Sequence, residues 1–379
     1  MLEQATYERV RNLRGIKWRR YGDDVISAWV ADMDIPPVKA VAEAMIPILQ
    51  DGDLGYNIDL AAQLLPAYAA WQDRHHGWNP DVERLRTFTG SLQALEAALW
   101  LRTDPGDGIV VFSPIYFPFL NVIEQTKRRI VDVRLDDETW RLDADRLESA
   151  IDSTTRMILF CQPHNPIGRV FDEAEVSAVA EMAEKHDLLV VTDEIWGDLT
   201  LTTPHRPLAT MDERLKGRLI TLGSASKTFS LAGLRCAVAH IDDERLTEKL
   251  DALPMHLLGS SSTVSAAGTL AAWTHGDEWV ASMRDHLRAR CEQLQTRLAA
   301  DLPEVTMTSP EATYFGWLDF RRTHIADDPS KHLLNEAKVA LSPGITFGAQ
   351  GAGHARINFA TSAEIIDDII DRIVELVRR

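Results

Sequence analysis

One lysine in this chain stands in surroundings suited to covalent chemistry with an aldehyde. Lys227 follows an apolar stretch and lies in the run Ser-Ala-Ser-Lys-Thr at residues 224–228. An amine at the end of a buried strand can form a Schiff base, because desolvation favours its neutral, nucleophilic form. Ser224, Ser226 and Arg235 are suited to holding a phosphate beside it, since hydroxyls and a guanidinium fork both bind phosphate oxygens. An aldehyde and a phosphate on one ligand indicate pyridoxal 5'-phosphate (PLP).

Two residues further up the chain suit the ring of this cofactor. Asp193 ends the apolar run Leu188–Thr192, where a buried carboxylate would keep the pyridine nitrogen protonated by raising its pKa. Asn165 lies in a His-Asn-Pro-Ile-Gly turn after another apolar run, and its amide could donate to the 3'-oxygen of the ring. We therefore expect both side chains to contact the pyridine ring.

The phosphate and the ring face need further contacts. Gly90, Ser91 and Leu92 open an amphipathic helix, and the free N–H groups of a helix N-terminus bind phosphate. Tyr116, in a Ser-Pro-Ile-Tyr-Phe segment, is the candidate to stack on the pyridine ring. An aromatic residue in an apolar stretch is also typical of plain core packing, so both interpretations stay open for Tyr116.

These residues must be positioned by an α/β framework. From about residue 85 to 245, short β-branched runs alternate with helical patterns, which predicts a mostly parallel sheet with helices on both faces. Ligands of such sheets lie at the carboxyl ends of the strands, where Asn165, Asp193 and Lys227 fall. The expected strands are Gly108–Phe112, Arg129–Leu135, Met157–Cys161, Leu188–Thr192, Leu219–Leu222 and Cys236–Ile241.

A chain of 379 residues exceeds one ordinary core, so we expect a large and a small domain. Residues 46–260 form the predicted PLP-binding domain, and residues 261–379 a smaller α/β domain on which residues 1–45 pack. Glu173–His186 is an expected helix with a capping box from Asp172 and Glu175, and Ser362–Arg379 is an expected terminal helix with apolar residues three and four apart.

Composition narrows the possible partners. The net charge of −17 argues against nucleic acid and anionic membranes, because phosphate binding needs clustered Lys and Arg. The first residues do not resemble a signal peptide, and no apolar stretch is long enough to span a bilayer. Cys161, Cys236 and Cys291 form no C-x-x-C pair and cannot all pair. Cys161 and Cys236 lie in apolar, strand-like runs and are expected to be buried free thiols, as suits a cytoplasmic protein. The adjacent His75 and His76 point to different faces of a helix, so we expect no metal site there.

The order of these sites along the chain resembles that of the fold-type I PLP enzymes, the aspartate aminotransferase superfamily. Gly90, Asn165, Asp193, the Ser-x-Ser-Lys run ending at Lys227, and Arg235 follow one another as the cofactor residues do in that superfamily. The resemblance implies an enzyme that acts on an amino acid. It implies further that Arg356 binds the substrate carboxylate. It also implies a homodimer, in which Tyr56 of Gly55-Tyr56-Asn57 reaches the phosphate of the neighbouring subunit.

The N-terminal third is similar to one branch, the cystathionine β-lyase (C–S lyase) group of the MalY/PatB type. Ile16-Lys17-Trp18 and the run Trp29–Asp34 (Trp-Val-Ala-Asp-Met-Asp) carry this similarity. It implies elimination of a thiol from a sulfur-containing L-amino acid, with Ala31 and Asp32 beside the substrate.

Three positions depart from that branch. Ser230 stands where the group usually has Asn, and Arg235 follows the aminotransferase pattern. Trp196 stands where aminotransferases often have Tyr and the lyases often have His. The indole N–H of Trp196 could still donate to the 3'-oxygen of the ring. Transamination therefore stays open as an alternative to elimination.

Two rival interpretations have less support. A PLP-fold protein used only for binding or regulation would be expected to lose Lys227, Asp193 or Arg356, and all three are present. The glycine-rich run at 344–353 does not fit a dinucleotide fingerprint between a strand and a helix, and we expect it to close over the substrate.

Overall fold

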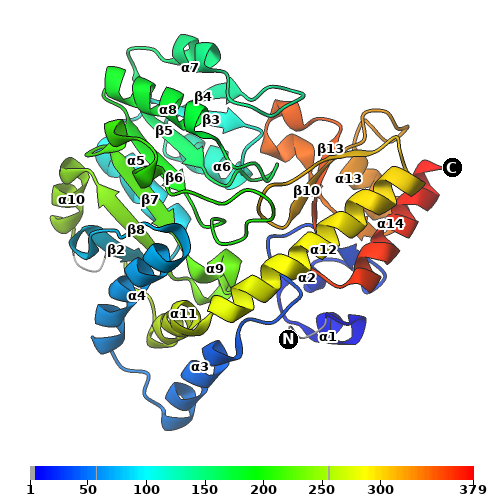
Figure 1. The fold of residues 1–379 in the computed structure, drawn as a ribbon, viewed down its shortest axis with the longest axis horizontal. Helices are drawn as coiled ribbons and strands as arrows, with labels where there is room; N and C mark the ends of the chain where they lie inside the picture. The colour runs from blue at the N-terminus through cyan, green and yellow to red at the C-terminus, as the bar shows by residue number, and fades with distance from the viewer. Residues whose placement is uncertain (1–4, 57, 255–256) are drawn as a thin grey trace.

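The computed structural model describes residues 5–56, 58–254 and 257–379, and its core is a seven-stranded sheet. The strand order is β2-β8-β7-β6-β5-β3-β4, parallel from β7 to β4 and antiparallel on both sides of β8 (Figure 1). The strands are β2 (Leu85–Phe88), β3 (Gly108–Ser113), β4 (Arg129–Arg134), β5 (Thr155–Cys161), β6 (Leu189–Asp193), β7 (Leu219–Gly223) and β8 (Ala237–Asp242). This confirms the six expected strands to within two residues, and the mostly parallel sheet.

Helices cover both faces of this sheet, as expected. Alternate residues of a strand point to opposite faces, so Ile109 and Val111 pack in one apolar cluster and Val110 and Phe112 in another. The first cluster is covered by α5 (Ser91–Arg102) and α6 (Phe117–Gln125), and the second by α7 (Ala144–Ala150) and α8 (Glu173–Lys185). The capping box predicted for α8 is present, with Asp172 and Glu175 each accepting from the backbone of the other.

Further helices lie beside the sheet, and short turns occur along the whole chain. The long α4 (Asp59–His76) packs against α11 (Thr263–His275), which also contacts α3 (Lys39–Asp51). The short α9 (Ala225–Thr228) follows β7, and α10 (Glu244–Asp251) follows β8. Short 3-10 turns span Val82–Arg84, Leu208–Thr210, Glu213–Leu215, Ala232–Leu234, Gly344–Phe347 and Ala349–Gly351, and a π turn spans Leu333–Ala337.

A four-stranded antiparallel sheet in the order β12-β13-β10-β9 organises the C-terminal part. Its strands are β9 (Thr306–Thr308), β10 (Phe315–Asp319), β12 (Ser342–Pro343) and β13 (His354–Asn358). The helices of this part are α12 (Asp277–Asp301), α13 (Pro329–His332) and α14 (Ala363–Val377). Figure 1 shows α12 crossing from α11 to α14, so one long helix joins the two parts. The expected terminal helix is confirmed as α14, whose buried isoleucines lie three and four residues apart.

The N-terminal segment lies against the C-terminal part. It contains α1 (Tyr7–Asn12) and α2 (Ile16–Arg19), and β1 (Ile26–Ser27) pairs in parallel with β11 (Val339–Ala340). The Tyr7 hydroxyl donates to Asp368 in α14 at 2.7 Å. Among the described residues, no helix is both long and apolar enough to cross a membrane.

Candidate active site

A cavity opens at the carboxyl ends of β5, β6 and β7, and most of the predicted site residues line it. Twelve of the predicted positions meet there: Ala31, Gly90, Ser91, Leu92, Tyr116, Asn165, Asp193, Trp196, Ser224, Ser226, Lys227 and Arg235. These residues come from six separate stretches of the chain, so the fold brings together what the sequence only orders. Arg356 and Asp32 lie next to lining residues, whereas Tyr56 lies elsewhere on the surface.

Lys227 presents its amine to this cavity from α9. Its Nζ donates to the main-chain oxygen of Ala31 at 3.2 Å and lies 5.7 Å from the centre of the Trp196 ring. Burial lowers the pKa of Lys227 below its usual range, opposed by the nearby Asp32 carboxylate and assisted by Arg356. A lowered pKa increases the share of the neutral amine, the form that both a Schiff-base lysine and a general base use.

Ser224, three residues before Lys227, has a structural role. The Ser224 hydroxyl accepts from Ser226 N at 3.1 Å and donates to Cys236 O at 2.8 Å, so it caps α9 and links it to the start of β8. A phosphate contact of the Ser224 hydroxyl would have to coexist with these two hydrogen bonds. The contacts of the Ser224 and Ser226 hydroxyls with the phosphate stay a prediction.

Asp193 is the last residue of β6 and is almost fully buried. Burial raises the pKa of Asp193 to about 7, although the Ile195 N–H and the charge of Lys227 both act to lower it. A buried carboxylate with so little compensation is poised to pair with a cation. A protonated pyridine nitrogen placed opposite would be that cation.

Asn165 and Arg356 bind each other across the two parts of the protein. The Asn165 Oδ1 accepts from an Arg356 guanidinium nitrogen at 2.7 Å, which leaves the Asn165 NH2 group as the donor for a ligand. The turn that carries Asn165 is itself firmly held.

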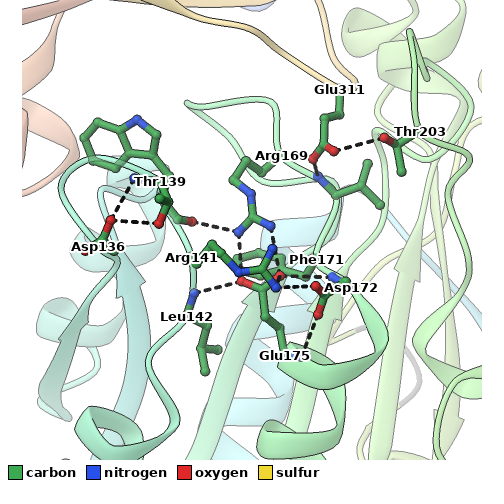
Figure 2. A network of polar contacts seen from close by, with 12 residues as sticks. Asp136, Thr139, Arg141, Leu142, Arg169, Phe171, Asp172, Glu175, Thr203 and Glu311 are labelled. Atoms are coloured by element: carbon green, nitrogen blue, oxygen red, sulfur yellow. Dashed lines mark hydrogen bonds and ion pairs between the residues drawn. The ribbon is translucent and has the colours of Figure 1, made fainter.

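Figure 2 shows the contacts that hold this turn. Arg169 makes two parallel bonds to Glu175, at 2.8 and 2.9 Å, and a third to the oxygen of Trp140. Glu311 accepts from Val170 N at 2.8 Å and from the Thr203 hydroxyl. A fully bonded support of this kind fixes the direction of the Asn165 side chain.

The Arg356 guanidinium is buried between two aromatic rings. Its carbon lies 3.8 Å from the centre of the Phe315 ring and 4.9 Å from that of Phe347. Its second nitrogen donates to Trp29 O at 3.0 Å and to Ser342 Oγ at 3.2 Å. Burial lowers the pKa of Arg356 to about 10, so it remains cationic at neutral pH. The loop at 344–353 reaches the site through Phe347, and its closure over a substrate stays a prediction.

Arg235 lies close to the start of α5. A side chain at Gly90 would come within 2.9 Å of the Arg235 guanidinium, so the arginine lies directly over the N-terminus of α5. Arg235 holds a left-handed backbone, with φ 54°. The N–H groups of a helix N-terminus and a guanidinium both bind phosphate oxygens, so the phosphate contact predicted for Gly90 and Arg235 is sterically consistent with this arrangement and stays a prediction.

The Trp29–Asp34 segment contributes main-chain oxygens to the site. Trp29 O accepts from Arg356, and Ala31 O accepts from Lys227 and from the Tyr314 hydroxyl at 2.8 Å. The Asn358 amide donates to Val30 O and Asp32 O, each at 2.7 Å. The segment therefore bridges the lysine and the arginine.

The two N-terminal motifs that resemble the lyase branch are joined through Asp34. This buried carboxylate accepts from Lys17 Nζ at 2.9 Å and from Trp18 Nε1 at 2.7 Å. Ser230, one of the departures, has a left-handed φ of 57° and accepts from Met33 N at 3.3 Å. Asn tolerates such a backbone better than most residues, which gives a physical reason for its use at this position in the related group.

Several residues at the site were not predicted. Tyr314, Phe315 and Ser342 lie more than a hundred residues from the Trp29–Asp34 segment and nothing local marks them, whereas Thr89 and Ile195 adjoin predicted residues and could have been included. Cys161 and Cys236 line the cavity and are buried and free, as predicted, and Cys291 is also buried and free. The adjacent histidines are paired separately, His75 with Asp277 and His76 with Asp198.

A seven-stranded α/β sheet with a part-buried lysine and a buried aspartate, asparagine and arginine at one cavity defines a fold-type I PLP-dependent enzyme. The chain belongs to the aminotransferase class I and II family, whose model matches residues 29–373. Pyridoxal 5'-phosphate is its cofactor, and the residues present fit this group: a buried, weakly compensated carboxylate for the ring nitrogen, an amide donor, a guanidinium over a helix N-terminus and a desolvated lysine.

Within this family, the chain is similar to several named proteins. The chain is 30% identical over 371 residues to cystathionine β-lyase PatB of Bacillus subtilis, covering 95% of this chain and 96% of PatB. A putative PLP-dependent β-cystathionase structure from Corynebacterium diphtheriae matches with a TM-score of 0.94 at 28% identity over the whole of both chains. The PLP-containing structure of cystalysin from Treponema denticola matches with a TM-score of 0.92 at 25% identity, covering 100% of this chain and 99% of cystalysin.

Proposed function

We propose that this enzyme is a C–S β-lyase that eliminates a thiol from a sulfur-containing L-amino acid such as L-cystathionine. With cystathionine the balanced reaction consumes one water and yields homocysteine, pyruvate and ammonia. The observation that carries the proposal is the Trp29–Asp34 segment, which resembles the lyase branch and whose oxygens meet both Lys227 and Arg356. The named cystathionine β-lyase relatives support the same reaction.

Each end of the substrate has a proposed partner. Arg356 would bind the α-carboxylate, a group whose shape a planar guanidinium matches and an ammonium does not. Because its Nη2 donates to both Trp29 O and Ser342 Oγ, two parallel bonds to the carboxylate would replace one of these contacts. Its aromatic neighbours Phe315 and Phe347 exclude water and so strengthen that ion pair. Ala31 and Asp32 would adjoin the substrate amine and side chain.

The proposed cofactor contacts follow the same geometry. Gly90, Ser91 and Leu92 at the start of α5, with Ser224, Ser226 and Arg235, would hold the phosphate. Asp193 would pair with the ring nitrogen, Asn165 and Trp196 would donate to the 3'-oxygen, and Tyr116 would stack on the ring. Burial raises the pKa of Tyr116, so its hydroxyl stays protonated at neutral pH.

Lys227 would perform the proton transfer. Bound PLP supplies an electron sink for the pair left on the substrate Cα when its proton departs. The neutral Lys227 amine would remove that proton, and the Cβ–S bond would then break with its electron pair leaving on sulfur. The departing thiolate takes up a proton, and water later releases pyruvate and ammonia.

Product analysis tests this proposal. Purified PLP-loaded protein is incubated with L-cystathionine while pyruvate and free thiol are assayed together, with Lys227→Ala as the control. Equal amounts of both products that disappear in the variant are expected. No pyruvate, with amino-group transfer from simple amino acids to a 2-oxo acid, would instead establish the alternative, an aminotransferase. The family and the arginine pair Arg235 and Arg356 favour that alternative.

We also propose that the enzyme acts as a homodimer. Large apolar side chains are exposed on α3, on the connection to α4 and before α11: Ile46, Leu49, Leu54, Tyr56, Ile58 and Leu257. Figure 1 shows α3 and this connection projecting from the body of the protein. Tyr56 is fully exposed and would reach the phosphate of the neighbouring subunit, while the adjacent Asn57 lies outside the described residues.

A further inference from the structure

A buried carboxylate lies behind the helix that carries Lys227. Asp198 follows β6 and the loop of Trp196, is 7% exposed, and accepts three side-chain hydrogen bonds. Its Oδ2 accepts from the Thr228 hydroxyl at 2.7 Å, and its Oδ1 accepts from Trp71 Nε1 at 3.0 Å and bonds His76 Nε2 at 2.8 Å. None of these four residues is among those that line the cavity.

This carboxylate is a charged acceptor at neutral pH. Burial alone would raise the pKa of Asp198, but the bond and charge of His76, with the bonds from Thr228 and Trp71, hold it below its usual range. Hydrogen bonds to an ionised acceptor are about twice as strong as those between neutral groups. The Thr228 bond to Asp198 is therefore a strong one.

That bond fixes one end of a helix that has no stability of its own. α9 has only four residues, and a single isolated turn is unstable because nucleation is unfavourable. Its N-terminal end is held by Ser224, through Ser226 N and Cys236 O. Its C-terminal end is held by the bond from Thr228, the residue directly after Lys227.

Asp198 links this helix to other elements of the site. It lies in the loop that begins after Asp193 and contains Trp196, and its main-chain oxygen accepts from Arg284 Nε of α12 at 2.6 Å. Trp71 and His76 add α4 to the junction. A shift of this carboxylate would move Lys227 relative to the residues proposed to hold the ring.

We propose that Asp198 is a positioning residue that acts through Thr228 to set where the Lys227 amine lies. The proposal rests on the proposed role of Lys227, and it is independent of the choice between elimination and transamination. A misplacement on the order of 1 Å can slow a reaction by about a hundredfold. A bond that holds the backbone next to the reacting amine is therefore expected to affect rates more than affinity.

The test compares two substitutions at Thr228. Thr228→Val removes the donor with little change of shape, and Thr228→Ser keeps the hydroxyl. We expect added PLP to attach to Lys227 about 10- to 100-fold more slowly in the valine variant, as measured by the visible absorbance of the cofactor. We also expect a lower kcat with little change in KM. The serine variant should recover both. This attachment rate can be measured even if the enzyme makes no pyruvate, so a failed lyase assignment would not be mistaken for failure here.

Trp71→Phe provides the matched control. It removes one hydrogen bond to the same carboxylate from α4 instead of α9, and keeps an aromatic ring beside Phe229. We expect a lower melting temperature with an unchanged attachment rate. Equal slowing in both variants, or a wild-type rate in Thr228→Val, would show that the cluster only stabilises the core.

A second variant covers the case in which Thr228→Val does not fold. Asp198→Asn keeps one acceptor oxygen but removes the charge, so it should slow PLP attachment by a smaller factor. A wild-type attachment rate in a folded Asp198→Asn protein would overturn the proposal.

Discussion

At the scale of single residues, the Asp193 carboxylate makes the stability of the cofactor-free enzyme depend on pH. Its pKa is about 7 when folded against an ordinary 3.8, so the folded state disfavours ionisation. Stability from this group is present below pH 4 and is lost as the pH rises through 7. About 3 pKa units correspond to roughly 4 kcal/mol at most. The protonated pyridine nitrogen of bound PLP should restore this lost stability by pairing with the ionised Asp193.

PLP should therefore raise the melting temperature more at pH 8 than at pH 5, and Asp193→Asn should lose that difference. The comparison with the asparagine variant matters because Lys227 must also lose a proton before it reacts with PLP. Calorimetry of both proteins with and without PLP at the two pH values measures the effect. If PLP raised the melting temperature of the wild-type protein and of Asp193→Asn by the same amounts at both pH values, Asp193 would not face the ring nitrogen.

Trp196 allows a second test at this scale. Its ring is buried against Tyr314 and Phe315, with ring centres 4.9 and 5.0 Å apart, so the indole has a fixed orientation. If its N–H donates to the 3'-oxygen, Trp196→Phe should shift the pH midpoint of the cofactor absorbance, and Trp196→His should partly restore it. An unchanged absorbance titration in the phenylalanine variant would contradict that contact.

The side chains of the site could be predicted from residue types in the sequence, but its main-chain contacts could not. Lys227, Asp193 and Asn165 could be predicted because each is a polar group at the end of an apolar strand. The carbonyl oxygens of Trp29 and Ala31 could not, since every residue has such an oxygen and only the fold selects which ones face the site. Tyr314 and Ser342 were missed for a related reason, because they approach from distant segments.

At the scale of elements, patterns of burial explain which strands could be predicted. The strands β3, β5, β6 and β7 are buried almost throughout and appear as short apolar runs. β2 was missed because its two central residues, Arg86 and Thr87, are half-buried at the edge of the sheet. A four-residue edge strand gives too weak a pattern to separate it from a loop.

The Lys17–Asp34 pair gives a prediction at the same scale, because it ties α2 to the Trp29–Asp34 segment. Both side chains are buried, at 4% and 0% exposure, and removal of one partner leaves an uncompensated charge that costs about 3–5 kcal/mol. Lys17→Met should therefore lower the free energy of unfolding by an amount of this order. It should also raise KM, since Trp29 O and Ala31 O would lose their fixed positions.

A double-mutant cycle checks this assignment. Lys17→Met with Asp34→Asn should destabilise less than the sum of the two single changes, because the second removes the unpaired charge that the first creates. Urea unfolding of the four proteins gives the coupling free energy. Additive losses would mean that the pair does not join these elements.

At the scale of the whole molecule, the exposed apolar surface around Tyr56 is consistent with the proposed dimer interface. Side chains of this size, exposed together along α3 and its connection to α4, are typical of a protein–protein interface. In the proposed homodimer each active site would use Tyr56 from one subunit and Lys227 from the other. A defect in Tyr56 and a defect in Lys227 would then lie in different active sites of a mixed dimer.

Mixing two variants with different defects tests this arrangement. Tyr56→Phe should bind PLP more weakly, through loss of the phosphate contact, and Lys227→Ala should be inactive. In a dimer with one chain of each kind, the chain with Lys227 receives an intact Tyr56 from its partner, so one site is complete. Activity at limiting PLP should therefore rise after the two proteins are unfolded and refolded together. If Tyr56 acted within its own chain, no mixed dimer would contain a complete site, and the mixture would show only the average of the two separate activities.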